Sequence, residues 1–67
     1  MFTEVSNGDD WVALYDGDEL VAQGREISYK DILDHLNKKY KEGYSEYADT
    51  AGMFPDNLSE IKDFKGY

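Results

Sequence analysis

A chain of 67 residues, with 15 acidic against 7 basic residues and a formal net charge of -8, has room for one domain. This charge excludes direct binding to nucleic acid, whose phosphates would repel the protein. The absence of cysteine excludes a disulfide framework, a thiolate zinc site and a cysteine nucleophile, so a reducing compartment is expected.

The composition favours a folded domain over a disordered chain, because 40% of the residues are hydrophobic and 15% are aromatic. The N-terminal residues lack the basic start and the apolar stretch of a secretion signal. No apolar run is long enough to cross a bilayer. We therefore expect a single cytoplasmic domain, residues 1–67, that has no membrane segment.

Two apolar runs, residues 11–15 and 19–23, flank an Asp-Gly step at residues 16–18. Such a step is a strong hairpin signal because glycine tolerates the positive φ that tight hairpin turns require. The short run over residues 1–5 is expected to pair as a third strand. The first third of the chain should thus form an antiparallel β-hairpin or a three-stranded sheet.

A helix is predicted to begin at Ser28, whose hydroxyl can cap a free backbone N–H, with Asp31 in its first turn. The apolar residues that follow recur at the three-, four- and seven-residue spacing of one helical face. This pattern predicts one long amphipathic helix that packs across the sheet. The residues on its face are Tyr29, Ile32, Leu33, Leu36 and Tyr40.

Gly43 leaves the end of this helix open, since it could be a left-handed cap or lie inside a longer helix at a cost of about 1 kcal/mol. Continuation to about residue 48 is favoured, because two further tyrosines extend the stripe. One short sheet cannot cover so long a face, so a homodimer that buries it is expected. The face comprises Tyr29, Leu33, Leu36, Tyr40, Tyr44 and Tyr47.

A second, short helix is expected over residues 58–64, where Asn57 and Glu60 have the spacing of a capping pair. The tail, residues 65–67, is expected to be loose. The predicted fold class is therefore α+β. It consists of an antiparallel β-hairpin or three-stranded sheet packed against one long amphipathic helix, plus a short C-terminal helix.

Residues suited to catalysis are scarce. His35 is the only histidine, and no serine or aspartate stands in a recognisable triad context, so an ordinary helical histidine is favoured and no enzyme is expected. The acidic stretches at residues 9–10 and 16–19 lack the alternating ligands and the twelfth-position glutamate of a calcium loop. No metal or other cofactor is expected.

Charge is segregated along the chain, because residues 1–24 hold six acidic residues and no basic one. Carboxylates spaced on a rigid hairpin can imitate the phosphates of a duplex. These carboxylates are Glu4, Asp9, Asp10, Asp16, Asp18 and Glu19. In these acids, and in its size, acidity, aromatic content and lack of cysteine, the chain resembles as a class the small acidic phage-encoded inhibitors that act as DNA mimics.

The resemblance implies a non-enzymatic inhibitor in the host cytoplasm that occupies the basic nucleic-acid-binding surface of a host protein. An HU-like nucleoid protein and RNA polymerase are examples of such a partner, and the six acids would bind it. Two alternatives remain: an acidic surface that serves solubility alone, and a small adaptor or structural protein that binds through the tyrosine-rich helix face. Rising salt should weaken mimicry steeply but an apolar contact little.

Overall fold

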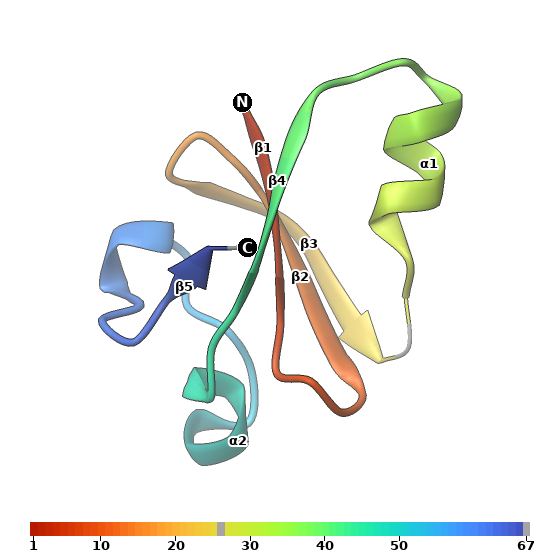
Figure 1. Ribbon diagram of the computed structural model, residues 1–67. Coiled ribbons are helices and arrows are strands. Elements are labelled where there is room, and N and C mark those ends of the chain that lie inside the picture. The colour runs from red at the N-terminus through yellow and green to blue at the C-terminus, as the bar shows by residue number, and fades with distance from the viewer. Residues whose placement is uncertain (26, 67) are drawn as a thin grey trace.

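The computed structural model describes residues 1–25 and 27–66, which form a five-stranded mixed sheet with short helices (Figure 1). In space the strands lie in the order β3-β2-β1-β4-β5. Their bounds are β1 (Phe2–Ser6), β2 (Trp11–Asp16), β3 (Glu19–Arg25), β4 (Tyr40–Tyr44) and β5 (Lys65–Gly66). The helices are α1 (Tyr29–His35), α2 (Tyr47–Ala51) and the 3-10 helix η1 (Leu58–Glu60).

The predicted hairpin and third strand are confirmed. β2 pairs antiparallel with β1 on one side and with β3 on the other, and Gly17 turns the β2–β3 hairpin with a φ of 60°. β1 also pairs with β4, in parallel, which makes the sheet mixed. A parallel neighbour requires a crossover, and the connection that contains α1 supplies it.

The prediction of one long helix across the sheet is wrong. α1 ends at His35, and Asn37 then adopts a left-handed φ of 56°, which asparagine tolerates better than most residues. Residues 40–44 form the strand β4 instead of further helix. The periodicity misled because a spacing of four residues places side chains on one face of a strand as well as of a helix.

Gly43 neither caps nor continues a helix. It is buried in β4, and a Cβ at this position would collide with the ring of Phe64. The close approach of the C-terminal segment to β4 therefore depends on a glycine here.

The C-terminal region also differs from expectation. Only η1 is helical within the predicted second helix, and Ile61 already has extended backbone. The predicted capping pair is confirmed, because the Glu60 carboxylate accepts a hydrogen bond from the Asn57 N–H at 3.2 Å. The expectation of a loose tail is wrong for residues 65 and 66, which form β5, while residue 67 lies outside the described residues.

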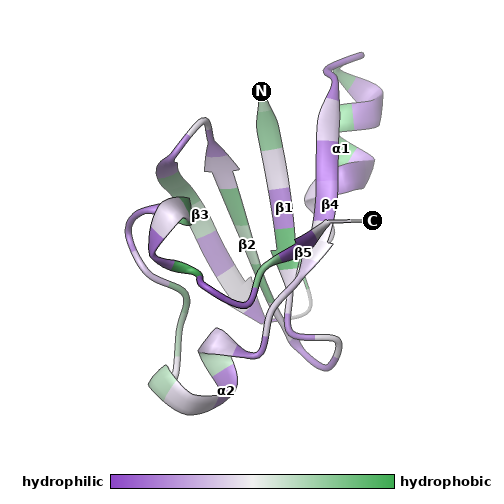
Figure 2. Ribbon diagram, turned by 60° about the vertical axis from the view of Figure 1, so that its left-hand side comes forward, coloured by the Kyte–Doolittle hydropathy of each residue, from purple (hydrophilic) through white to green (hydrophobic). Residues whose placement is uncertain are grey.

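Two apolar clusters lie on opposite faces of the sheet (Figures 1 and 2). On one face α1 packs through Tyr29 and Leu33 onto Leu14 of β2. On the other face lies the C-terminal layer, which we define as residues 45–64 and which includes α2 and η1. The buried residues of that second cluster are Val5, Ala13, Tyr15, Ala48, Phe54 and Ile61.

The expected tyrosine face is divided between these two clusters. Tyr29 and Tyr40 belong to the cluster under α1, whereas Tyr47 packs against the cluster under the C-terminal layer. Tyr44 lies beside Gly8 in the β1–β2 loop, and Leu36 is exposed at the end of α1. The continuous apolar surface on which the expectation of a homodimer rested is therefore not formed.

Candidate functional site

Acidic side chains are unevenly distributed over the fold. The C-terminal layer contains five acidic residues and one lysine, and residues 1–25 contain six acidic residues and one arginine. Residues 27–44, which include α1 and β4, contain three acidic residues and four lysines. The negative charge is thus concentrated in the hairpin region and the C-terminal layer.

One set of acids gathers where the β2–β3 turn meets η1. The Leu58 N–H donates to the Asp18 carbonyl at 2.9 Å, and the Leu20 N–H donates to the Asp56 carbonyl at 2.8 Å. These bonds bring acids from two distant parts of the sequence to one end of the sheet. We name them the turn group: Asp16, Asp18, Glu19, Asp56 and Glu60.

Asp18 has a structural role within the turn group. Its carboxylate accepts hydrogen bonds from the Ser59 N–H at 2.6 Å, the Ser59 hydroxyl at 3.2 Å and the Asn57 side-chain amide at 3.1 Å. These bonds, the Ser59 N–H first, lower the pKa of Asp18 because they stabilise the ionised form. Asp18 therefore fastens η1 to the hairpin.

Tyr15 is buried beside the turn group. Its ring is buried, and its hydroxyl donates to the Pro55 carbonyl at 2.6 Å. Burial raises the pKa of Tyr15 far above the usual value, and nearby negative charges, that of Glu60 foremost, raise it further. The hydroxyl therefore remains protonated and keeps its role as a donor.

A second set of acids lies at the opposite end of β2. The side-chain oxygen of buried Asn7 accepts hydrogen bonds from the backbone N–H groups of residues 9–11 at 3.0 to 3.1 Å, which fixes the loop. Its amide donates to Asp49 of α2 at 2.8 Å, and Asp10 forms an ion pair with Arg25 at 3.3 Å. We name this set the loop group: Asp9, Asp10 and Asp49.

Glu4, the remaining acid predicted to bind a partner, faces α1 instead. Its carboxylate accepts a hydrogen bond from the Lys30 N–H at 3.0 Å, while the predicted cap Ser28 forms no side-chain cap bond. Burial raises the pKa of Glu4 in spite of that bond, and the negative charge of Glu42 raises it further. Glu4 therefore caps α1 from a neighbouring strand.

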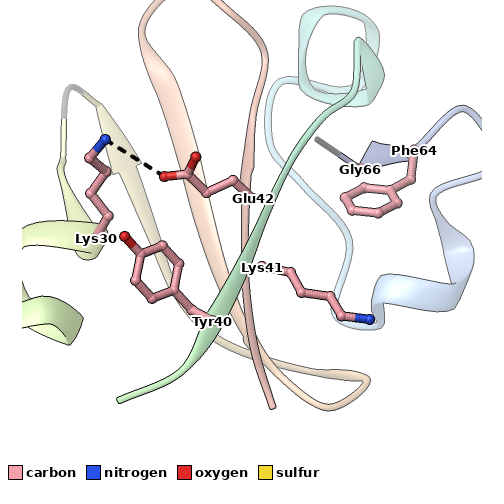
Figure 3. A pocket seen from close by; sticks show the side chains of 6 residues that line it. All are labelled: Lys30, Tyr40, Lys41, Glu42, Phe64 and Gly66. Atoms are coloured by element: carbon pink, nitrogen blue, oxygen red, sulfur yellow. Dashed lines mark ion pairs between the residues drawn. The ribbon is translucent and has the colours of Figure 1, made fainter. Parts of the chain in front are cut away.

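A depression lies along the edge of the sheet at β4 (Figure 3). β5 pairs only with Gly43 and Tyr44, so the first residues of β4 lie beyond it. Figure 3 shows the ion pair of Lys30 with Glu42, at 3.8 Å, on one side of β4 and Lys41 on the other. A lysine on an exposed strand edge, here Lys41, is typical of protection against pairing with other chains.

A second depression lies in the C-terminal layer, between α2 and the segment that includes the end of η1. Asp63 is fixed there by the Ser45 hydroxyl at 2.6 Å and the Glu46 N–H at 2.9 Å, and these bonds lower its pKa. We name this depression the α2 hollow. Its lining comprises Glu46, Tyr47, Thr50, Ala51, Glu60, Lys62 and Asp63.

Comparisons with protein-family models, with curated proteins and with solved structures found no match. His35 is exposed on α1. Within residues 1–25 and 27–66, no three His, Asp or Glu side chains are placed to hold a metal ion. In the same part of the chain, no helix has the length and apolarity needed to cross a membrane.

Of the six predicted acids, the fold brings Asp16, Asp18 and Glu19 together at one end of β2 and Asp9 and Asp10 together at the other. Sequence reasoning missed Asp56 and Glu60 in the turn group and Asp49 in the loop group. The capping pair of Asn57 and Glu60 did predict the start of a helix in this segment, of which η1 is formed. Nothing in its spacing, however, indicates that the segment docks on the hairpin.

Proposed function

We propose that this domain is a non-enzymatic acidic binding protein that occupies the basic nucleic-acid-binding surface of another protein and so inhibits it. The observation that carries the proposal is the position of the turn group and the loop group at opposite ends of β2. This strand has six residues, so its two ends, beside which the groups lie, are roughly 17 Å apart at about 3.3 Å per residue. That distance equals about five base-pair steps at about 3.4 Å of helix axis per step.

The rigidity of both groups supports the proposal. Asn7 fixes the loop group through three backbone N–H groups, and Asp18 fixes the turn group through η1. A backbone held in place before binding limits the conformational freedom that is lost when a partner arrives. Such an array favours a partner with two basic patches at a matching distance.

The proposed partner is a basic DNA-binding protein, for which an HU-like nucleoid protein and RNA polymerase are examples. The class resemblance to phage-encoded DNA mimics places the proposed site of action in a host cytoplasm. Because charge dominates such a contact, binding should weaken steeply with rising ionic strength.

The test begins with capture of partners from a bacterial lysate, followed by competition between the domain and a fluorescent duplex for each captured protein. The variant neutralises four acids of the two groups. The carboxylates of these four accept no hydrogen bond from a described residue and form no ion pair with an arginine or a lysine. These changes are Asp9→Asn, Asp16→Asn, Glu19→Gln and Asp56→Asn. We expect the wild-type domain to displace the duplex at low salt and the variant to lose this displacement.

Replacement of Lys38, Lys39 and Lys41 by glutamine is the control, because these lysines lie between α1 and β4, or at the start of β4, and should leave displacement intact. Equal displacement by the neutralised variant at low salt would overturn the proposal. Capture of proteins that bind no DNA would overturn it as well.

A second candidate function, a small adaptor, is supported by the outer surface of α1. Ile32 and Leu36 lie one turn apart and are 54% and 57% exposed. The tyrosine face is divided, so an apolar partner, or a second copy in the expected homodimer, would bind Ile32 and Leu36 instead. Binding that persists in high salt and is lost on changing both residues to glutamine would favour the adaptor. Sedimentation of the same variant tests the homodimer.

A further inference from the structure

The α2 hollow combines an apolar lining with an excess of negative charge. Tyr47, Thr50 and Ala51 supply apolar surface from one helix, α2. Three carboxylates and one lysine complete the lining, so the hollow carries a local excess of two negative charges. Lys62 forms no ion pair with any residue that the structure describes, so none of the three carboxylates is bound directly by this lysine.

The three carboxylates are held in position but keep free acceptor capacity. Glu60 accepts from the Asn57 N–H at 3.2 Å, and Glu46 accepts from the Tyr44 hydroxyl at 3.2 Å. Asp63 accepts one hydrogen bond on each carboxylate oxygen. Because an ionised carboxylate offers about four acceptor sites, each of the three can accept further hydrogen bonds from a ligand.

Tyr47 adds an aromatic surface that is fixed by packing. Its ring contacts the apolar cluster under the C-terminal layer, and its N–H donates to the Ser45 hydroxyl at 3.0 Å. A cation placed over such a ring is attracted by its electrons. An aliphatic side chain that ends in a cation would therefore find both an apolar wall and an anionic end in the α2 hollow.

We propose that the α2 hollow receives an arginine side chain of the basic partner protein. The inference rests on the proposed function and names an anchor for the same partner. Arginine fits better than lysine because its planar guanidinium offers five donors and can bind carboxylates in pairs while it stacks on a ring. The aliphatic part of the side chain packs against Tyr47 and Ala51.

The test uses the whole domain, labelled with nitrogen-15, and the peptide acetyl-Gly-Arg-Gly-amide as the probe. Titration at low salt should shift the backbone amides of residues 47–51 and 60–63 with saturation. Lysine in place of arginine should bind about threefold more weakly, because it lacks the paired donors. Citrulline, which has the same shape without the charge, should give no saturable shift.

Two variants with the same change in net charge locate the binding. Glu46→Gln with Glu60→Gln should weaken the affinity for the arginine peptide by at least about fivefold, and glutamine retains the cap at position 60. Asp16→Asn with Asp56→Asn removes two charges from the turn group. This variant should change the affinity for the arginine peptide by less than about twofold. Equal losses in both variants, equal shifts with citrulline, or shifts centred on another surface would overturn the inference.

The two proposals fail in different ways. Saturable binding of the arginine peptide in the α2 hollow, without displacement of duplex DNA from any captured protein, would sustain the anchor and overturn the proposed function. The opposite result has two parts: the Glu46→Gln and Glu60→Gln changes leave the displacement of DNA intact, and the arginine peptide does not bind in the α2 hollow. This result would overturn the anchor alone.

Discussion

The two faces of the sheet are covered in different ways. α1 is a regular helix that attaches through apolar contacts and a single capping carboxylate, Glu4. The C-terminal layer has little regular structure, so side chains of the sheet bind its backbone. Gln23 is one example, since its amide donates to the Phe54 carbonyl at 3.1 Å and its oxygen accepts from the Phe54 N–H at 2.8 Å.

A layer with only short helical segments therefore needs polar anchors as well as a core. Tyr15 binds the Pro55 carbonyl and Asp18 binds the Ser59 N–H, so three residues of the hairpin fasten the layer at successive points. An irregular segment can cover a sheet in this way because each backbone group that leaves water finds a partner.

Phe54→Ala should have the largest effect, because Phe54 is 1% exposed and lies in the cluster under the C-terminal layer. Loss of a buried phenylalanine costs about 3–5 kcal/mol, a large part of the stability of a small domain. Urea unfolding followed by circular dichroism measures the change in the free energy of unfolding. Met53→Ala, at the exposed neighbouring position, should cost well under about 1 kcal/mol. Similar losses in both variants would contradict the assigned packing.

Gln23→Ala should destabilise the C-terminal layer next, by about 2 kcal/mol, because it leaves the partly buried Phe54 backbone groups without their partners. The Trp11 indole N–H also loses its acceptor, which lies at 2.8 Å. Hydrogen exchange should show faster exchange at residues 54–61 while α1 stays protected. Loss of protection in α1 to the same extent would show that the two layers unfold together.

Gly43→Ala should cost about 1–3 kcal/mol, because the added methyl group displaces the Phe64 ring. Loss of amide protection at Lys65 and Gly66, which pair with β4, is the expected readout. Gly66→Ala is the matched control, since the nearest atom to its added Cβ is a Phe64 ring carbon at 3.8 Å. A change of similar size at both glycines would argue against the close contact at Gly43.

The smallest expected effect is on the pH dependence of stability, which should have opposite signs in the two layers. The pKa values of Asp18 and Asp63 are lowered by hydrogen bonds from Ser59 and Ser45, so the stability they add is present at neutral pH. It is lost as the pH falls below the ordinary value of 3.8 through their lowered pKa values. Asp18→Asn should reduce this dependence of the unfolding free energy on pH.

Glu4 has the opposite sign because burial raises its pKa above the ordinary value of 4.5. The folded state binds this proton more tightly than the unfolded state, so its effect favours folding in acid and disappears as the pH rises through the raised pKa. Glu4→Gln should therefore flatten the pH dependence of α1 protection in hydrogen exchange. A steeper dependence in this variant would contradict the assigned sign.

The hairpin is a part of the fold that local sequence predicts correctly. Gly17 in the turn and the apolar runs on either side predict β2, β3 and their pairing, because the signals lie within a few residues of one another. The run over residues 11–15 is apolar without interruption, which is typical of a strand covered on both faces. The part of the candidate site that lies in the hairpin was predicted as well, since its acids lie in the two connections beside β2.

The amino-acid sequence alone is enough to predict the acidity, the hairpin, the capping pair at Asn57 and the acids at both ends of one strand. It does not distinguish strand from helix at Tyr40 to Tyr44, because a four-residue repeat suits both. The parallel pairing with β1 selects the strand. Tertiary docking also added Asp49, Asp56 and Glu60 to the acidic groups, since contacts between residues about 40 positions apart leave no local pattern.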